Sequence, residues 1–160
     1  GTAGTTQRAE ITRFRTMPES AHENFARALY ELLYGDGPLA RRFDEYVLAM
    51  RIDGGASWPA ATWLAAAALP TEHVFVKPTY FKKQALVLEL ELNYDSSPNG
   101  ATYEQFMRAA VRCQERLIAA GLKPRDLIDV SAFISATLTP TAIRSVATDA
   151  KPKRVAKKDA

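Results

Sequence analysis

The stretch Trp58-Pro-Ala-Ala-Thr-Trp-Leu-Ala-Ala-Ala-Ala-Leu-Pro-Thr-Glu-His-Val-Phe-Val-Lys-Pro-Thr79 predicts an apolar helix followed by a short extended segment. Ser57-Trp-Pro59 is a helix start, with proline in the first turn, where its missing N–H costs no hydrogen bond. Val74-Phe-Val76 is β-branched and aromatic and lies between turn residues, so it predicts a short strand. Lys77 follows directly and precedes Pro78, and no packing rule requires a cation at that position.

Apolar residues at helical spacing predict further helices on both sides of this stretch. Ser20-Ala-His-Glu23 is a capping box, and the helix that it begins should end at Gly35 in a left-handed conformation. After Asp36-Gly-Pro38 a second helix should follow and pack antiparallel against the first. Thr102-Tyr-Glu-Gln105 is another capping box, and a last helix is expected to begin near Pro124.

Residues 79–94 fit both a helix and a strand. Phe81 and Ala85 recur at helical spacing, whereas the leucines of this segment alternate with other residues as they would in a strand. We favour a helix over the first part of the segment, to about residue 89, and then an extended piece into Asn93-Tyr94.

These patterns together predict a mainly α protein. We expect a single helical domain of about six helices, with one short strand or β-hairpin, over residues 19–140. A flexible arm at residues 1–18 should precede it, and a basic, disordered tail at residues 141–160 should follow it. The length of 160 residues and an apolar content of 47% agree with one soluble globular domain.

Composition also excludes several classes of protein. No apolar run approaches the roughly 20 residues that span a bilayer, and the first residues lack the pattern of a secretory signal. Cys113 is the only cysteine, which excludes an internal disulfide and indicates a reducing cytoplasm. His22 and His73 have no second ligand at metal-binding spacing, so neither a metal nor a cofactor is expected.

The net charge of +3 is concentrated at the end of the chain. The last ten residues carry five cations against Asp159, which leaves the rest of the chain nearly neutral. Flexible lysines can neutralise phosphates without reading bases, although the same composition suits a linker or a solubility tail. The five cations are Lys151, Lys153, Arg154, Lys157 and Lys158.

Lys77 is the first candidate for a binding site within the domain. Held before a proline, it could present its ammonium to a phosphate or a carboxylate, and strand alternation would place His73 on the same face. The ordinary alternative is a lysine that extends from an edge strand, with His73 on the surface. Lys82 and Lys83 follow Tyr80-Phe81, and together with Lys77 and the tail they could line one basic surface.

Arg125, Asp126 and Asp129 form a second candidate cluster. The two aspartates are three residues apart, so on a helix they share a face and could hold a divalent cation or anchor an arginine. The alternative is that both carboxylates stabilise the positive end of the helix dipole while Arg125 pairs with them. No metal is assigned to this cluster.

Motifs that carry catalysis are missing from the sequence. Glu89-Leu-Glu91 is followed by Leu-Asn, whereas a metal-dependent nuclease strand needs a lysine, and no phosphate-binding glycine loop or nucleophile elbow occurs. We therefore expect a non-catalytic module that binds nucleic acid or a protein partner through the basic tail and the patch of lysines and aromatics. The alternative is an enzyme or small-ligand domain that uses Lys77, His73 and Asp126 or Asp129, and a third is a purely structural subunit.

Three motifs resemble those of a family of uncharacterised bacterial proteins. They are Trp58-Pro-x-Ala-Thr62, Phe75-Val-Lys-Pro-Thr79 and Arg125-Asp-x-Ile-Asp-Val130, and the likeness covers about residues 25–135. Ile134-Ser135 stands where that family usually has an aromatic residue. The resemblance implies one bacterial domain with a helix after Thr79, and it implies no activity.

Overall fold

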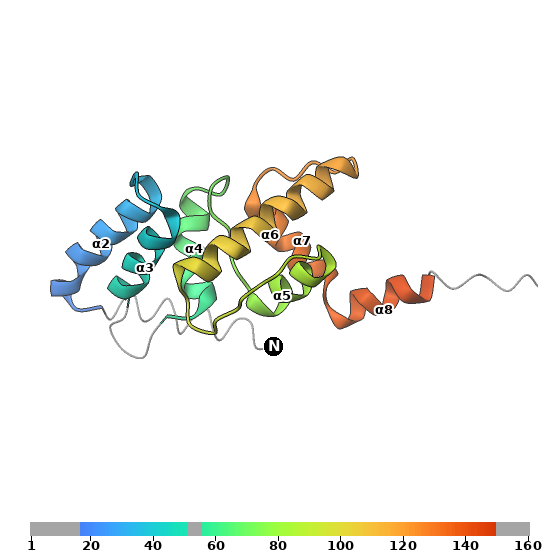
Figure 1. Cartoon of the computed structure of the whole chain (residues 1–160), viewed down its shortest axis with the longest axis horizontal. Coiled ribbons are helices and arrows are strands. Elements are labelled where there is room, and N and C mark those ends of the chain that lie inside the picture. Colours follow the sequence, from blue (N-terminus) through green and yellow to red (C-terminus); the bar gives the residue numbers. More distant parts are fainter. Residues whose placement is uncertain (1–16, 51–55, 150–160) are drawn as a thin grey trace, which may run out of the picture.

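The computed structural model describes residues 17–50 and 56–149, and this part of the chain is mainly α-helical (Figure 1). The described residues form seven helices, and six of them lie where the sequence predicted helices, which confirms the fold class. The helices are α2 (Glu19–Tyr34), α3 (Leu39–Met50), α4 (Trp58–Ala68), α5 (Pro78–Val87), α6 (Gly100–Ala119), α7 (Leu127–Thr137) and α8 (Pro140–Asp149).

The helix α8 occupies residues that the sequence predicted to be part of a disordered tail. The Thr139 side chain accepts a hydrogen bond from the amide of Ala142 at 3.1 Å, and Pro140 stands in the first turn. This start signal is local and outweighs the loss of apolar residues on which the prediction of disorder depended. The five cations of residues 151–158 and most of the predicted N-terminal arm lie outside the described residues.

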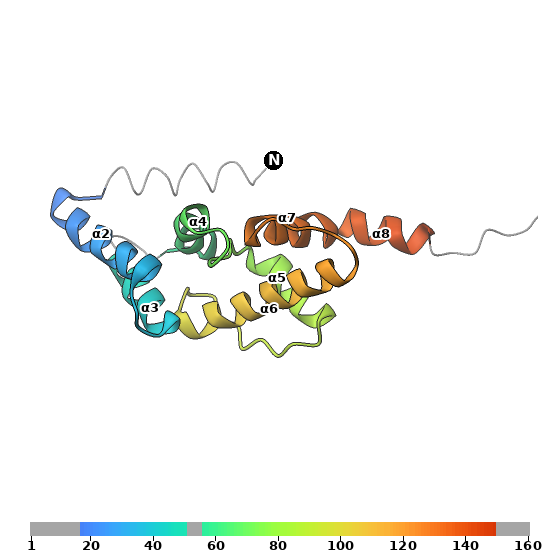
Figure 2. The same cartoon turned by 90° about the horizontal axis from the view of Figure 1, so that it is seen from above.

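Helices α2 and α3 form an antiparallel hairpin at one end of an elongated molecule, and α8 extends from α7 at the other end (Figures 1 and 2). Between them, α6 packs on α3 near its start and on α5 and α7 further along. The core is aromatic where these helices meet. The ring of Tyr103 stacks on Phe43 at 4.1 Å between centroids, and Phe106 meets Trp58 at 5.0 Å and Phe81 at 5.5 Å.

Neither predicted capping box forms, because other groups begin these helices. Pro18 stands at the N-cap of α2, where the structure has no side-chain hydrogen bond. In α6 the cap is Asn99, whose side chain accepts from the amide of Thr102, while the Gln105 side chain instead accepts from the amide of Asn93 at 2.7 Å.

The turn between α2 and α3 also differs from its prediction. Gly35 has φ −74° and is therefore not left-handed. The last carbonyls of α2, at Glu31 and Leu32, accept hydrogen bonds from the Arg42 guanidinium, which also donates to the carbonyl of Gly37. An arginine from the next helix thus satisfies carbonyls that a left-handed glycine motif would otherwise satisfy.

The predicted strand at Val74–Val76 is wrong, because the described residues contain no strand. The segment is extended, but side chains take the place of a partner strand. The amide of Val76 donates to the Thr62 hydroxyl at 3.0 Å, and the amide of Val74 donates to Tyr103 at 3.4 Å. The carbonyl of Phe75 accepts from the Ser131 hydroxyl at 2.9 Å. Helices α4, α6 and α7 each supply one of these side chains, so they hold the segment in the core.

Candidate functional site

His73 and Lys77 do not form a shared exposed face. His73 is buried, with Nδ1 3.1 Å from the Tyr103 hydroxyl and its ring stacked on that of Tyr103. Burial, together with the nearby charge of Arg42, lowers the pKa of His73 to about 4, so its imidazole is neutral at pH 7. Lys77 is half-buried at the start of α5, where its Nζ lies 5.6 Å from the centre of the Phe75 ring. The expectation that His73 lies on the surface is therefore wrong.

Lys82 and Lys83 lie on different flanks of α5. The exposed Lys82 places its Nζ 4.3 Å from the centre of the Tyr94 ring, on the segment between α5 and α6. The Lys83 Nζ turns to the end of α7, where it donates to the carbonyl of Leu138 at 3.3 Å. Of these two lysines, Lys82 is the one whose ammonium stays on an open surface.

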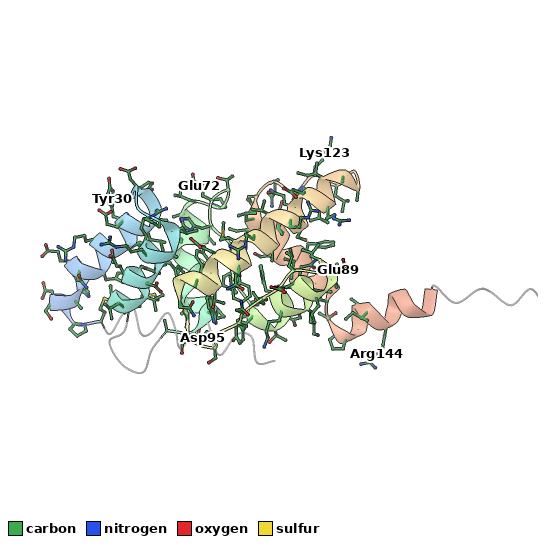
Figure 3. All side chains as sticks on the ribbon, viewed as in Figure 1. Tyr30, Glu72, Glu89, Asp95, Lys123 and Arg144 are labelled. Atoms are coloured by element: carbon green, nitrogen blue, oxygen red, sulfur yellow. The ribbon has the colours of Figure 1, made fainter. Side chains whose placement is uncertain are left out.

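A groove runs beside Lys82, between the last turns of α5 and the segment that follows it. Its volume is about 470 Å³. The predicted helix over residues 79–89 is confirmed nearly to its end, because α5 stops at Val87 and Glu89 takes a left-handed φ of 55°. The chain then turns back in an irregular segment toward Asp95, which lies at the opposite end of this segment from Glu89 (Figure 3).

The cluster of Arg125, Asp126 and Asp129 is held together by internal bonds. The Asp126 side chain caps α7 by accepting from the amide of Asp129 at 2.9 Å. Asp129 accepts from the Arg125 amide, from its Nε and, at 2.8 Å, from its Nη2. The guanidinium of Arg125 holds the pKa of Asp129 well below its usual range. Arg125 thus pairs with Asp129, as the second interpretation expected, whereas the N-cap role of Asp126 was not predicted. The residues that the structure describes contain no group of three metal-ligating side chains.

Cys113 lies in the core face of α6. Burial raises the pKa of its thiol to about 11, so the thiolate that would act as a nucleophile is scarce at pH 7. Cys113 therefore serves as a small apolar side chain in the core.

A basic surface on α6 was not predicted from the sequence. Arg108, Arg112 and Arg116 are exposed and four residues apart, so they form one row about 6 Å apart along the helix axis; we call it the α6 arginine row. Arg112 also pairs with Glu115 at 2.9 Å, at a site where both side chains are more than half exposed. Lys123 lies just beyond the end of the helix (Figure 3). The spacing of the three arginines in the sequence was sufficient to predict this row.

Charge is unevenly divided over the described residues. Residues 105–125 contain five cations and one carboxylate, whereas acidic residues outnumber basic ones in the rest of the described chain. The α2–α3 hairpin alone has six carboxylates against three arginines. The basic end of α6 therefore stands out against an acidic body.

Comparison with protein-family models, with curated proteins and with solved structures finds no match to this chain. The resemblance to a bacterial family therefore stays a prediction. Within residues 17–50 and 56–149, no helix is long and apolar enough to cross a membrane.

Proposed function

We propose that this chain is a non-catalytic, cytoplasmic module that binds nucleic acid through its phosphates. The observation that carries the proposal is the α6 arginine row, which lies on an otherwise acidic body. Arginine donates paired hydrogen bonds that match phosphate oxygens, and exposed cations of this kind bind phosphates without reading bases. The proposed binding is therefore independent of sequence and sensitive to salt.

Two further sets of cations support the proposal. The exposed Lys82 lies against Tyr94, and a cation beside an aromatic ring is a common element of surfaces that bind single strands. The cations of residues 151–158 would add phosphate contacts from a second part of the chain. No catalytic group is needed for any of these contacts.

The alternative, a small-ligand or catalytic site, would require rearrangement of groups that are already bonded. His73 would have to leave Tyr103 and the core, and Asp129 would have to leave Arg125. A buried neutral histidine and a helix cap are accounted for by folding alone. No contact of the described residues favours this alternative.

The test is fluorescence anisotropy of labelled single-stranded DNA, single-stranded RNA and duplex DNA with the full chain over a range of salt concentrations. We expect affinity to fall as salt rises, with a logarithmic slope of roughly 0.7 for each phosphate neutralised on a single strand. On single strands, the double substitution Arg108→Gln with Arg116→Gln should reduce that slope by about 1.4, the loss of two contacts.

The matched control is Arg27→Gln with Arg41→Gln, which removes the same charge from exposed arginines of the α2–α3 hairpin. This control should leave the slope unchanged, because the hairpin is acidic overall. Equal effects of the two double variants would show a response to net charge alone and would contradict a site on α6. No salt-dependent affinity in the full chain would contradict binding to nucleic acid itself.

A further inference from the structure

Helices α4 and α7 form a part of the surface that has almost no charged side chains. They have 11 residues each, and the one charged side chain in the two helices is that of Asp129. The guanidinium of Arg125 pairs with this carboxylate at 2.8 Å. The α2–α3 hairpin, in contrast, is acidic, and the end of α6 is basic.

The outer sides of α4 and α7 look in the same direction. Trp58 of α4 packs on Phe43 of α3 and on Phe106 of α6, and the buried side of α7 packs on α5 and α6. Figure 2 shows α3 and α6 along one side of the molecule and α4 and α7 along the other. Since α4 also packs on α7, the sides of both helices that point away from α3 and α6 form one continuous surface, which we call the α4–α7 face.

The α4–α7 face exposes apolar side chains. Trp63 is 37% exposed and Ile128 is 39% exposed. The exposed Ala67 and Ala132 follow them by four residues, so on each helix the two side chains lie on the same side. Trp58 belongs to the aromatic core, whereas Trp63 lies outside the core cluster, so folding does not account for a tryptophan there. Tryptophan is enriched among the residues that dominate the energy of protein interfaces.

We propose that the α4–α7 face is the contact surface of a symmetric homodimer, in which it packs against the same face of a second copy of this chain. A twofold axis brings a surface against itself, so a charged surface meets its own charge. The acidic hairpin and the basic end of α6 would therefore repel their own copies, whereas the α4–α7 face would not. Nucleic acid does not suit this face, because the face has no cation to meet a phosphate apart from the paired Arg125.

The size of the face sets the strength of the contact. A helix of 11 residues is about 16 Å long and about 10 Å wide, so two of them offer roughly 300 Å². A stable interface takes about 800 Å² from each partner. We therefore expect a weak dimer that forms and dissociates reversibly.

The homodimer goes beyond the proposed function and does not depend on it. Because α6 lies on the opposite side from the α4–α7 face, the dimer leaves both α6 arginine rows uncovered (Figure 2). Two such rows on one particle could bind one nucleic acid together, which raises the apparent affinity without a new contact.

The test is sedimentation equilibrium of the full chain, without nucleic acid, from about 10 µM to about 1 mM. We expect the average mass to rise from that of one chain toward that of two. The rise should persist in about 0.5 M NaCl, since salt screens charges and this contact has none to screen. Association through the acidic hairpin and the basic end of α6 would instead disappear in salt.

The variants Trp63→Lys and Ile128→Lys each place a cation in the face. Both should weaken the dimer about tenfold or more, because the ammonium meets an apolar surface or its own copy. Both positions are partly exposed, so the melting temperature should stay close to that of the wild-type chain. The matched control is Leu48→Lys on α3, at a leucine that is 65% exposed, and it should leave the dimer unchanged.

Three results would overturn the homodimer. The first is the mass of one chain at every concentration, which would leave the α4–α7 face to another segment of the chain or to another protein. The second is association that is lost in salt. The third is an equal effect of Leu48→Lys and Ile128→Lys, which would place the contact elsewhere on the molecule.

Discussion

The Thr62 hydroxyl accepts a hydrogen bond from the amide of Val76 at 3.0 Å and donates one to the carbonyl of Trp58 at 2.8 Å. Both residues of the first bond are fully buried. The substitution Thr62→Val keeps the shape of the side chain but leaves the Val76 amide without its acceptor. We expect the free energy of unfolding, measured in urea, to fall by about 1–3 kcal/mol.

The control for this prediction is Thr71→Val, at an exposed threonine in the turn after α4. It should change the free energy of unfolding by less than about 0.5 kcal/mol. If Thr62→Val were equally harmless, the extended segment would not depend on the α4 side chain for its hydrogen bond.

The buried His73 predicts a loss of stability in mild acid. Its pKa is about 4 in the folded chain and about 6.5 when unfolded, so the unfolded state binds the additional proton first. Stability should therefore fall as pH falls through 6.5 toward 4. Between pH 7 and pH 5, above the range in which most carboxylates titrate, we expect a decrease of about 2 kcal/mol in the free energy of unfolding.

Two measurements distinguish the contribution of His73 to this pH dependence from the contributions of other groups. His73→Gln should flatten the pH dependence of the free energy of unfolding. Independently, NMR titration of the His73 ring in the wild-type chain should show no protonation near pH 6. A midpoint near 6.5 would refute the burial of the imidazole as a source of this pH dependence.

Gly100 is the point at which α6 touches α3. A Cβ at Gly100 would lie 2.0 Å from the carbonyl oxygen of Ala40, which no side-chain rotation can relieve. The amide of Gly100 also donates to Asp44 at 2.8 Å, and the amide of Ala40 to Glu104 at 3.2 Å. Gly100→Ala should therefore force the two helices apart. We expect it to lower the free energy of unfolding, measured by thermal unfolding, by about 3 kcal/mol or more.

The matched substitution is Gly37→Ala. Its Cβ would meet only the Arg42 side chain, at 3.8 Å, which is an ordinary contact distance. We expect the melting temperature of this variant to stay close to that of the wild-type chain. Similar losses of stability in both variants would mean that the close approach of α6 to α3 does not cause the loss in Gly100→Ala.

Helices were predictable from the sequence because an apolar stripe is a local pattern. The packing of His73 was not, because His73 lies between α4 and α5 and its partner Tyr103 lies on α6, 30 residues away. The strand prediction failed for the same reason: a β-branched run looks alike whether its amides donate to a neighbouring strand or to the hydroxyls of Thr62 and Tyr103. Among the candidate site residues, the pairing of Arg125 with Asp129 was predicted as one of two alternatives. The N-cap role of Asp126 was not, because the helix was expected to begin near Pro124 and begins at Leu127.

Because Asp126 caps α7 and Asp129 pairs with Arg125, we predict that this cluster stabilises the helix and does not bind a metal ion. Asp126→Ala should lower the free energy of unfolding by about 1 kcal/mol, because the first turn of α7 loses its cap. Magnesium or calcium should not raise the melting temperature of the wild-type chain, since the carboxylate of Asp129 is occupied by Arg125. A concentration-dependent rise that is absent from Asp126→Ala would contradict the helix-cap interpretation.

Lys82 and Lys83 are neighbours in the sequence, yet we expect a substitution at Lys82 to change binding and one at Lys83 to change stability. Lys82→Gln removes an exposed ammonium from the proposed phosphate-binding surface, so the salt dependence of nucleic-acid affinity should weaken by roughly one contact, with stability nearly unchanged. Lys83→Gln breaks the bond to the carbonyl of Leu138 at the end of α7, so it should cost about 1 kcal/mol of stability and leave the salt slope unchanged. The two variants have the same net charge, and each serves as the control for the other. If they shift the slope equally, the difference between the two flanks of α5 has no part in binding.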